Sequence, residues 1–451
     1  MAEKILLIRP YYGVNIHTDA QGEYGTILDG NDVFPDLPLI TAATILEQAE
    51  DYEVEIIEAV ARKMLPDELL SRIFMSDFDT AVIKSSAASI RSDLEVARQI
   101  KKNVPGCTVM IAGHAALRIQ DWIYENTSVD TVIDEPIDYY IYRYVTGEDA
   151  TINDLPSPDY SLIDYRKYTD DFDKVRLTVQ SSRGCPMGCK YCPYITYYNG
   201  YEERDLEKVL EDLKLVSSLG ADIIQFRDQY FTRDKERITK LCNMIIGSGL
   251  KIKWICETRL DSLDQELIKL MKEAGLFLVC FGIESSDDSI LDYYSSHKGS
   301  FKVQKETIAF LKEMGILTMA FYIIGFPEDT WESLEKTYRY ANELDSDIVK
   351  FNEFADFDLS HVDKLTPDVF VPFENITNTN KPSTLTRAEI RYIIELFSTM
   401  YTLRHDPLKK AYDYNHLLTS YNRQVAAEIS AYEKDLITMS REIRLIDSRH
   451  Q

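Results

Sequence analysis

The chain has 451 residues, 45% hydrophobic and 28% charged, which is enough for about two or three soluble domains with their own cores. Its formal net charge of −25 disfavours nucleic acid as the main partner, because phosphate contacts need clustered Lys and Arg. No run of about 18 apolar residues is present, so we expect no membrane span. The N-terminus enters a strand-like run directly, without a signal-like segment, and a reducing, cytoplasmic location is expected.

The first 150 residues alternate short β-rich runs with helical patterns. We expect strands at 4–9, 54–58, 80–85, 108–112 and 131–133, and helices at 39–49, 66–75, 92–103 and 119–124. Strand–helix alternation with short connections predicts an α/β fold whose residues 1–150 form a doubly wound, Rossmann-like parallel sheet. Ligands of such sheets bind beyond the carboxyl ends of the strands, which are followed here by loops at 10–13, 59–62, 85–89, 113–116 and 134–136.

A linker at 151–171 contains two nearby prolines and precedes a second alternating series over 172–355. Strands are expected at 176–181, 223–227, 253–257, 277–282, 318–324 and 347–353, with a helix after each of the first five. Six such repeats predict a partial (β/α)6 barrel, with its site at the carboxyl ends of the strands. Residues 356–451 are expected to hold an irregular segment and then a mainly helical module over 386–447.

Three cysteines follow the first strand of the second series, in the run Arg183-Gly184-Cys185-Pro186-Met187-Gly188-Cys189-Lys190-Tyr191-Cys192. Thiols spaced C-x3-C-x2-C can hold three irons of a four-iron cluster and leave the fourth iron open for chemistry. A zinc site is the alternative, but zinc usually takes four protein ligands, and no fourth Cys or His lies nearby. A chance cluster of three of the seven cysteines is the remaining alternative. The other four, in apolar contexts, are expected to be buried thiols.

The cysteine spacing, with an aromatic residue before the last cysteine, resembles the radical S-adenosylmethionine (SAM) superfamily. The resemblance implies that Cys185, Cys189 and Cys192 ligate a [4Fe–4S] cluster and that the open iron binds SAM. One electron, from a donor of the flavodoxin or ferredoxin type, would then cleave SAM to methionine and a 5′-deoxyadenosyl radical.

The later strand ends resemble further motifs of that superfamily, at 225–232, 257–260, 282–285 and 321–328. By this resemblance the SAM-binding residues would be Tyr191, Asp228, Arg259, Glu284, Ser285 and Ile323. An acidic side chain could accept from the SAM ammonium group, and a guanidinium could bind a carboxylate. The alternatives are solvated acidic residues, local salt bridges or caps. Phe321 departs from the family pattern, which often has Gly there.

The first 150 residues resemble the cobalamin-binding domain of the B12-dependent branch of that superfamily. The resemblance rests on Phe34–Leu39, Gly113-His114 and the linker run 155–160. It implies cobalamin contacts from Tyr11, Leu37, Val60, Ser85, Ser86, Ser89, Gly113, His114, Asp134 and Glu135. No His follows the second strand, so the cobalt would lack a lower axial histidine. A domain that has lost the cofactor is the alternative, since fold alone does not fix function.

The resemblance implies a cobalamin-dependent methyltransferase that acts on an unactivated carbon through a 5′-deoxyadenosyl radical and methylcobalamin. Two alternatives stay open: a non-methylating radical reaction such as cyclisation, rearrangement or oxidation, and a SAM or iron–sulfur sensor without turnover. The acidic composition favours a basic or neutral substrate, and a peptide or protein residue is the expected class.

Overall fold

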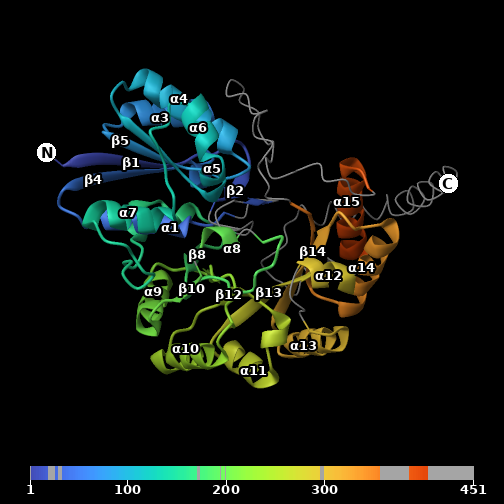
Figure 1. Cartoon of the computed structure of the whole chain (residues 1–451). Helices are drawn as coiled ribbons and strands as arrows, with labels where there is room; N and C mark the ends of the chain where they lie inside the picture. Colours follow the sequence, from blue (N-terminus) through green and yellow to red (C-terminus); the bar gives the residue numbers. More distant parts are fainter. Residues whose placement is uncertain are drawn as a thin grey trace.

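The computed structural model describes residues 2–18, 26–28, 33–169, 173–192, 194–198, 200–294, 299–355 and 385–404. Two parallel sheets follow each other along the chain, each with its own helices (Figure 1). No helix of the described residues is long and apolar enough to cross a membrane.

The first sheet has five parallel strands in the order β4-β1-β5-β6-β7. These strands are β1 (Glu3–Arg9), β4 (Tyr52–Glu58), β5 (Thr80–Lys84), β6 (Thr108–Ala112) and β7 (Thr131–Val132). The order along the sheet reverses between β1 and β5. In doubly wound sheets, the carboxyl ends at such a reversal form the ligand-binding crevice.

Helices cover both faces of this sheet (Figure 1). One face carries α1 (Leu37–Glu47) and α7 (Ile137–Thr146), which pack together through Leu39, Ala42, Ile137 and Ile141. The other face carries α3 (Pro66–Met75), α4 (Ile90–Asn103), α6 (Gln120–Asn126) and the shorter α2 (Ala59–Arg62) and α5 (His114–Arg118). A small antiparallel hairpin, β2 (Asn15–His17) with β3 (Thr26–Leu28), follows β1.

The second sheet has six parallel strands in the order β15-β14-β13-β12-β11-β8, so each strand lies beside its predecessor. Its strands are β8 (Arg176–Val179), β11 (Ile223–Phe226), β12 (Trp254–Thr258), β13 (Leu276–Glu284), β14 (Leu317–Ile324) and β15 (Ile348–Glu353). The connecting helices are α9 (Leu206–Ser218), α10 (Lys235–Ser248), α11 (Gln265–Glu273), α12 (Asp288–Tyr294), α13 (Phe301–Glu313) and α14 (Trp331–Leu344), with a 3-10 turn η3 (Leu260–Ser262) after β12. These βα repeats confirm the predicted partial barrel.

The two faces of the second sheet carry different residues. Leu177, Phe226, Val279 and Tyr322 pack against the helices. The opposite, inner face carries an apolar group that includes Ile255, Leu278, Cys280 and the half-buried Met319 and Phe321. Several helices begin at a side chain that accepts from the backbone of the first turn, namely Asp234, Asp264, Ser300 and Thr330.

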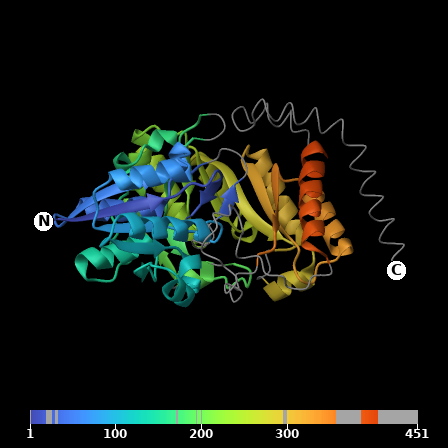
Figure 2. The same ribbon diagram turned by 90° about the horizontal axis from the view of Figure 1, so that it is seen from above.

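Helix α15 (Arg387–Arg404) packs on β15 and β14 through Ile390, Ile393, Phe397 and Tyr401. Figure 2 shows it at the end of the molecule away from the first sheet. It confirms a helix in the predicted C-terminal module. The irregular segment over 356–384 and the helix predicted beyond 404 lie outside the described residues.

The linker crosses the open edge of the barrel at β8 with two 3-10 turns, η1 (Tyr160–Leu162) and η2 (Tyr165–Lys167). The Tyr160 hydroxyl donates to the Thr178 carbonyl at 2.6 Å and accepts from the Thr178 amide at 3.3 Å. The Arg176 amide donates to the Tyr168 carbonyl at 2.9 Å. The linker thus supplies partners that a neighbouring strand would otherwise provide to an edge strand.

Replacing Tyr160 with Phe should lower the free energy of unfolding by about 1–3 kcal/mol, because the Thr178 amide and carbonyl would stay buried without this partner. Urea unfolding followed by circular dichroism measures this change in the free energy of unfolding. Tyr165→Phe is the control, since no hydrogen bond of its hydroxyl is found among the described residues. Equal losses in both variants would contradict the proposed role of Tyr160.

Candidate active site

The cysteine loop (residues 185–192) leaves the carboxyl end of β8 through a short hairpin. Strand β9 (Ser182–Gly184) pairs antiparallel with β10 (Tyr201–Glu203), and α8 (Tyr194–Tyr197) lies between them. Gly184 has a φ of +85°, and a Cβ there would lie 2.0 Å from the Gly200 carbonyl oxygen. Only glycine lets the two strands approach this closely, so Gly184 closes the loop that carries the thiols.

The three thiols form a chemically suitable donor set. Cys189 is buried, and Cys185 and Cys192 are half-buried. Burial raises the pKa of Cys185, and raises the pKa of Cys192 to about 12, with the neighbouring thiols adding to both shifts. Thiolates in such surroundings need a positive partner, which iron would supply. In the part of the chain that the structure describes, no three Cys, His, Asp or Glu side chains converge as ligands of one ion. A four-iron cluster requires no such convergence, because each thiolate binds a different iron.

Asp228, at the carboxyl end of β11, is engaged by the turn that precedes the cysteine loop. Its carboxylate accepts from the Ser181 amide at 2.8 Å, the Ser181 hydroxyl at 2.5 Å and the Ser182 hydroxyl at 2.6 Å. Burial raises its pKa, an effect that these hydrogen bonds reduce. Asp228 therefore ties β11 to the base of the hairpin. Its predicted contact with SAM stays a prediction.

Glu284 ends β13 in a strained conformation directly across from the cysteine loop. Its φ is +69°, and the register with β14 shifts between Gly282 and Glu284. A non-glycine residue in this region costs about 1–3 kcal/mol, and such strain is concentrated at functional sites. The Tyr191 hydroxyl donates to Glu284 Oε1 at 2.9 Å. The cysteine loop and the fourth barrel strand thus meet through two residues that the sequence predicted for SAM.

The other predicted SAM residues lie at neighbouring strand ends. Ser285 is buried beside Glu284. Arg259 follows β12 and pairs with Asp261 through Nε at 2.9 Å and Nη2 at 2.6 Å. It also lies near enough to Cys185 to lower the pKa of that thiol, against the larger effect of burial. Ile323 is half-buried on the inner face of β14. The structure therefore gathers these residues around the barrel mouth.

A cluster of hydroxyls lies at the order reversal of the first sheet. Asp93 of α4 is fully buried and accepts from the hydroxyls of Tyr12, Ser85 and Ser89 at 2.6, 2.6 and 2.7 Å. The Ser86 and Ser89 hydroxyls lie 2.8 Å apart. Asp93 thus fixes the loop after β5, where the sequence predicted three cobalamin contacts.

The loop after β6 reaches the barrel. A Cβ at Gly113 would lie 2.5 Å from the Ser85 carbonyl oxygen, so glycine brings the ends of β5 and β6 together. The buried His114 ring stacks on the Tyr197 ring of α8, with centroids 4.7 Å apart and planes at 24°. The carboxyl ends of the first sheet therefore contact the segment that follows the cysteine loop.

A family model described as the Radical SAM superfamily matches residues 179–341, from the end of β8 into α14. This range includes the cysteine loop and the strand ends around it. The chain contains a radical SAM domain.

Two curated proteins are similar to parts of this chain. The anaerobic magnesium-protoporphyrin IX monomethyl ester cyclase of Cereibacter sphaeroides is 29% identical over 59% of this chain and 45% of its own length. The bacteriochlorophyllide d C-12(1)-methyltransferase of Chlorobaculum tepidum is 22% identical over 75% of this chain and 73% of its own length. This chain thus spans about half the length of the cyclase.

Solved structures show the same two-part fold. The radical SAM methyltransferase TsrM from Kitasatospora setae, with cobalamin and a [4Fe–4S] cluster bound, aligns with a TM-score of 0.60 at 15% identity over 78% of this chain and 72% of TsrM. The cobalamin-dependent SAM radical enzyme OxsB, with aqua-cobalamin bound, aligns with a TM-score of 0.62 at 15% identity over 78% of this chain and 53% of OxsB. The predicted fold class, a Rossmann-like domain before a radical SAM partial barrel, is confirmed.

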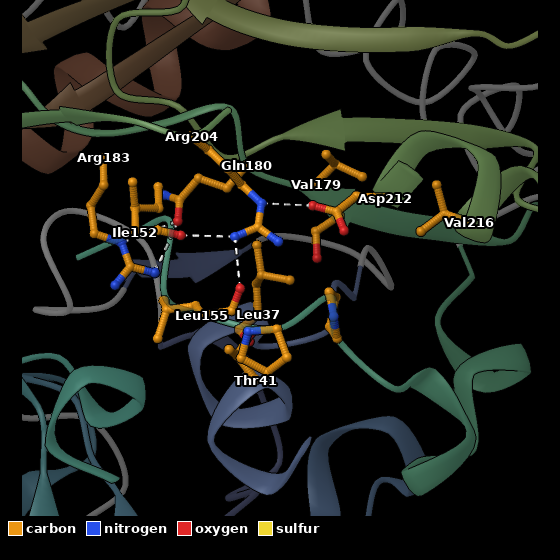
Figure 3. Close-up of a pocket in the computed structure, with 13 residues that line it drawn as sticks. Leu37, Thr41, Ile152, Leu155, Val179, Gln180, Arg183, Arg204, Asp212 and Val216 are labelled. Atoms are coloured by element: carbon orange, nitrogen blue, oxygen red, sulfur yellow. Dashed lines mark hydrogen bonds and ion pairs between the residues drawn. The ribbon is translucent and has the colours of Figure 1, made fainter. Parts of the chain in front are cut away.

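Five residues predicted for cobalamin have other partners. Tyr11 and Val60 pack in the hydrophobic core. Asp134 and Glu135 both pair with Arg143 Nη2 at 2.9 Å. Leu37 lines a small cavity between α1, the linker and the radical SAM domain (Figure 3). Their cobalamin contacts stay predictions.

That cavity, of about 30 Å³, is organised by a structural arginine. Arg204 donates through Nε to Asp212 at 3.0 Å and through Nη1 to the carbonyls of Ile152 and Leu155 at 2.8 and 3.1 Å (Figure 3). The cavity has room for about one water molecule. The cavity lies on the linker side of β8, so we assign it a packing role.

The buried carboxyl of Asp93 makes stability depend on pH. Burial raises its pKa to about 6, while hydrogen bonds from Ser85, Tyr12 and Ser89 act in the opposite direction. Its pKa in the unfolded chain is near 3.8. The folded state therefore holds this proton more tightly, and the stability from that proton is complete below the unfolded pKa and is lost as pH rises through about 6.

Asp93→Asn should remove this titration. Relative to the variant, the wild-type protein should lose about 2 kcal/mol of unfolding free energy between about pH 4 and pH 7. Urea unfolding at each pH measures the difference, and taking variant against wild type cancels the contribution of other titrating groups. Parallel curves for the two proteins would show that the Asp93 pKa is not raised.

Proposed function

We propose that this chain is a cobalamin-dependent radical SAM methyltransferase that C-methylates an unactivated carbon, with a peptide or protein residue as the first substrate class to test. When bound, the cluster and SAM would supply a 5′-deoxyadenosyl radical, and the corrinoid would supply the methyl group as methylcobalamin. The protein must then hold both groups and the substrate carbon in one water-poor space.

The observation that carries this proposal is the meeting of the two sets of strand ends. The His114 ring, from the loop after β6, stacks on Tyr197 at 4.7 Å. The cysteine loop on the other side touches the end of β13 through the Tyr191–Glu284 hydrogen bond of 2.9 Å. Residues 185–192 and 194–198 therefore lie between the carboxyl ends of the first sheet's strands and the mouth of the barrel.

The residues present fit the proposed groups. Cys185, Cys189 and Cys192 would hold the cluster. Glu284 and Arg259 offer a carboxylate and a guanidinium to the charged ends of SAM. Near the end of the first sheet, the Ser85, Ser86 and Ser89 hydroxyls could hydrogen-bond the amide-bearing edge of a corrinoid. No His follows β4, so a bound corrinoid would be held here without a lower axial histidine from that loop.

The net charge of the chain and the apolar group inside the barrel support a peptide or protein side chain as the substrate. The net charge of −25 favours a basic or neutral substrate over an acidic one. The inner barrel face carries an apolar group with Ile255, Leu278, Met319 and Phe321, which suits an aliphatic or aromatic side chain. We also propose that an electron donor of the flavodoxin or ferredoxin type reduces the cluster.

A non-methylating reaction is the second candidate, because the cyclase of Cereibacter sphaeroides is 29% identical over 59% of this chain. The two candidates differ in how they consume SAM. Methylation uses one SAM as methyl donor, leaving S-adenosylhomocysteine, and a second as radical source, leaving 5′-deoxyadenosine. Cyclisation needs only the radical source.

The deciding experiment is anaerobic turnover with SAM that carries a trideuterated methyl group. Reconstituted protein, reductant, hydroxocobalamin and a set of basic and neutral peptides are incubated, and mass spectrometry follows all products. We expect a trideuteromethyl group on carbon, with S-adenosylhomocysteine and 5′-deoxyadenosine formed in equal amounts. 5′-Deoxyadenosine with a modified but unlabelled product would favour the second candidate.

A further inference from the structure

A buried ion pair joins the root of the cysteine loop to the Rossmann-like domain. Arg183 of β9 donates through Nη1 and Nη2 to the two carboxylate oxygens of Asp138, at 3.0 and 2.7 Å. Both side chains are almost fully buried, with exposed fractions of 4% and 1%. This geometry is a bidentate fork, which fixes orientation as well as distance. Arg183 stands two residues before Cys185.

The surroundings of Arg183 leave its guanidinium little freedom. Its Nε and Nη2 also donate to the Gln180 side-chain oxygen at 3.1 and 2.9 Å. The guanidinium lies over the Tyr139 ring, 4.6 Å from the centroid. Burial lowers the pKa of Arg183, but the nearby Asp138 outweighs this effect, and the net pKa lies well above the usual range. The side chain is therefore a charged and rigid connector.

Asp138 lies in α7, a helix that packs on one face of the first sheet and makes contacts on both sides. It lies in the first turn of α7, where a negative charge is favoured by the helix dipole. Helix α7 packs along α1, and its Tyr139 hydroxyl donates to Glu202 of β10 at 3.1 Å. The Ile152 amide donates to the same carboxylate at 2.9 Å. Both strands of the hairpin thus contact the Rossmann-like domain or its linker.

We propose that Arg183 and Asp138 form a positioning pair, which sets the distance from the cysteine loop to the strand ends of the Rossmann-like sheet. Stability alone does not explain such a pair, because burying two charges often yields little net stabilisation. A fork between a residue adjacent to the cluster and a helix of the other domain instead restricts how the two domains sit. The inference rests on the proposed function, in which that distance separates the cluster from the corrinoid.

The test measures this distance directly by pulsed electron paramagnetic resonance between the reduced cluster and cob(II)alamin. Asp138→Asn leaves a buried guanidinium unpaired and should lower thermal stability. The double variant Asp138→Asn with Arg183→Gln removes both charges and should regain most of that stability. If the pair positions the loop, the double variant should still show a distance distribution about twofold wider than wild type, because two amides lack the rigid fork.

Two further variants keep the test decisive. Arg183→Lys retains the charge but loses the fork, and should widen the distribution in a protein that still folds. Arg143→Gln, on the same helix, removes half-exposed pairs to Asp134 and Glu135 and should leave the distance unchanged. A narrow, wild-type distribution in a stable double variant or in Arg183→Lys would overturn the proposal.

A second readout needs no cofactor. Hydrogen exchange of the β9 and β10 amides in the free protein should be about tenfold faster in Arg183→Lys than in wild type, with α10 unaffected. Unchanged exchange in β9 and β10 would overturn the proposal by itself. If no corrinoid binds at all, the proposed function fails, and the exchange experiment still decides whether the pair fixes the hairpin.

Discussion

Replacing Gly184 with Ala should abolish incorporation of the iron–sulfur cluster although all three cysteines remain. The new Cβ would lie 2.0 Å from the Gly200 carbonyl oxygen and 3.0 Å from its carbon, and backbone atoms cannot move aside as a flexible side chain does. The β9–β10 pair would have to open where the cysteine loop begins. We expect bound iron to fall from about four per chain to well below one, measured after anaerobic reconstitution.

Gly220→Ala is a closely matched control. Gly220 has the same φ of +85° as Gly184, but a Cβ there meets nothing within 4 Å. This variant should pay only the conformational cost of about 1–2 kcal/mol and retain full iron content. If Gly184→Ala also bound a full cluster, close strand approach would not be what shapes the cysteine loop.

Replacing Glu284 with Gln should weaken SAM binding by about 10- to 100-fold while iron content stays unchanged. The substitution keeps the size of the side chain but removes the charge, and a hydrogen bond to a charged group contributes about 1.5–3 kcal/mol. Glu284 is held at a φ of +69°, so its carboxylate is presented at a fixed position by a strained backbone. The affinity is measured by equilibrium dialysis with the reconstituted protein.

Tyr191→Phe separates two explanations for that loss. Tyr191 donates to Glu284 at 2.9 Å, so Glu284 could act on SAM or could merely anchor the cysteine loop. A Phe variant removes the anchor and leaves the carboxylate. We expect its SAM affinity to fall less than that of Glu284→Gln. Equal losses would mean that Glu284 affects SAM binding only through Tyr191, which the sequence also predicted for SAM.

The βα architecture could be predicted because local sequence patterns, namely apolar runs and helix caps, indicate its strands and helices. The buried strands β5 and β13 contain short apolar runs, at 81–83 and 276–281, and capping residues such as Asp234 and Thr330 mark the helix starts. Parallel strands place their carboxyl ends at one edge, so the strand-end residues of the barrel could be grouped without coordinates. The meeting of Tyr191 with Glu284 follows from that topology.

The contacts that join the two domains could not be predicted in this way. Arg183 stood in the cysteine motif, but nothing local connects it with Asp138, 45 positions earlier in the chain. Helix α7 was itself not predicted, since Tyr139, Tyr140 and Tyr142 resemble a strand as much as a helix. Asp228 shows the opposite case, in which a residue predicted for a ligand is engaged by Ser181 and Ser182. Such pairings depend on long-range packing.

The most direct test of the two-cofactor account is the composition of the anaerobically reconstituted protein. Iron, acid-labile sulfide and corrinoid are quantified per chain, together with the visible spectrum. The account predicts about four irons, four sulfides and one corrinoid, held by the cysteine loop and by the strand ends around Ser85 and Gly113. A protein that holds about four irons but no corrinoid would contradict the two-cofactor account, while remaining consistent with a radical SAM domain.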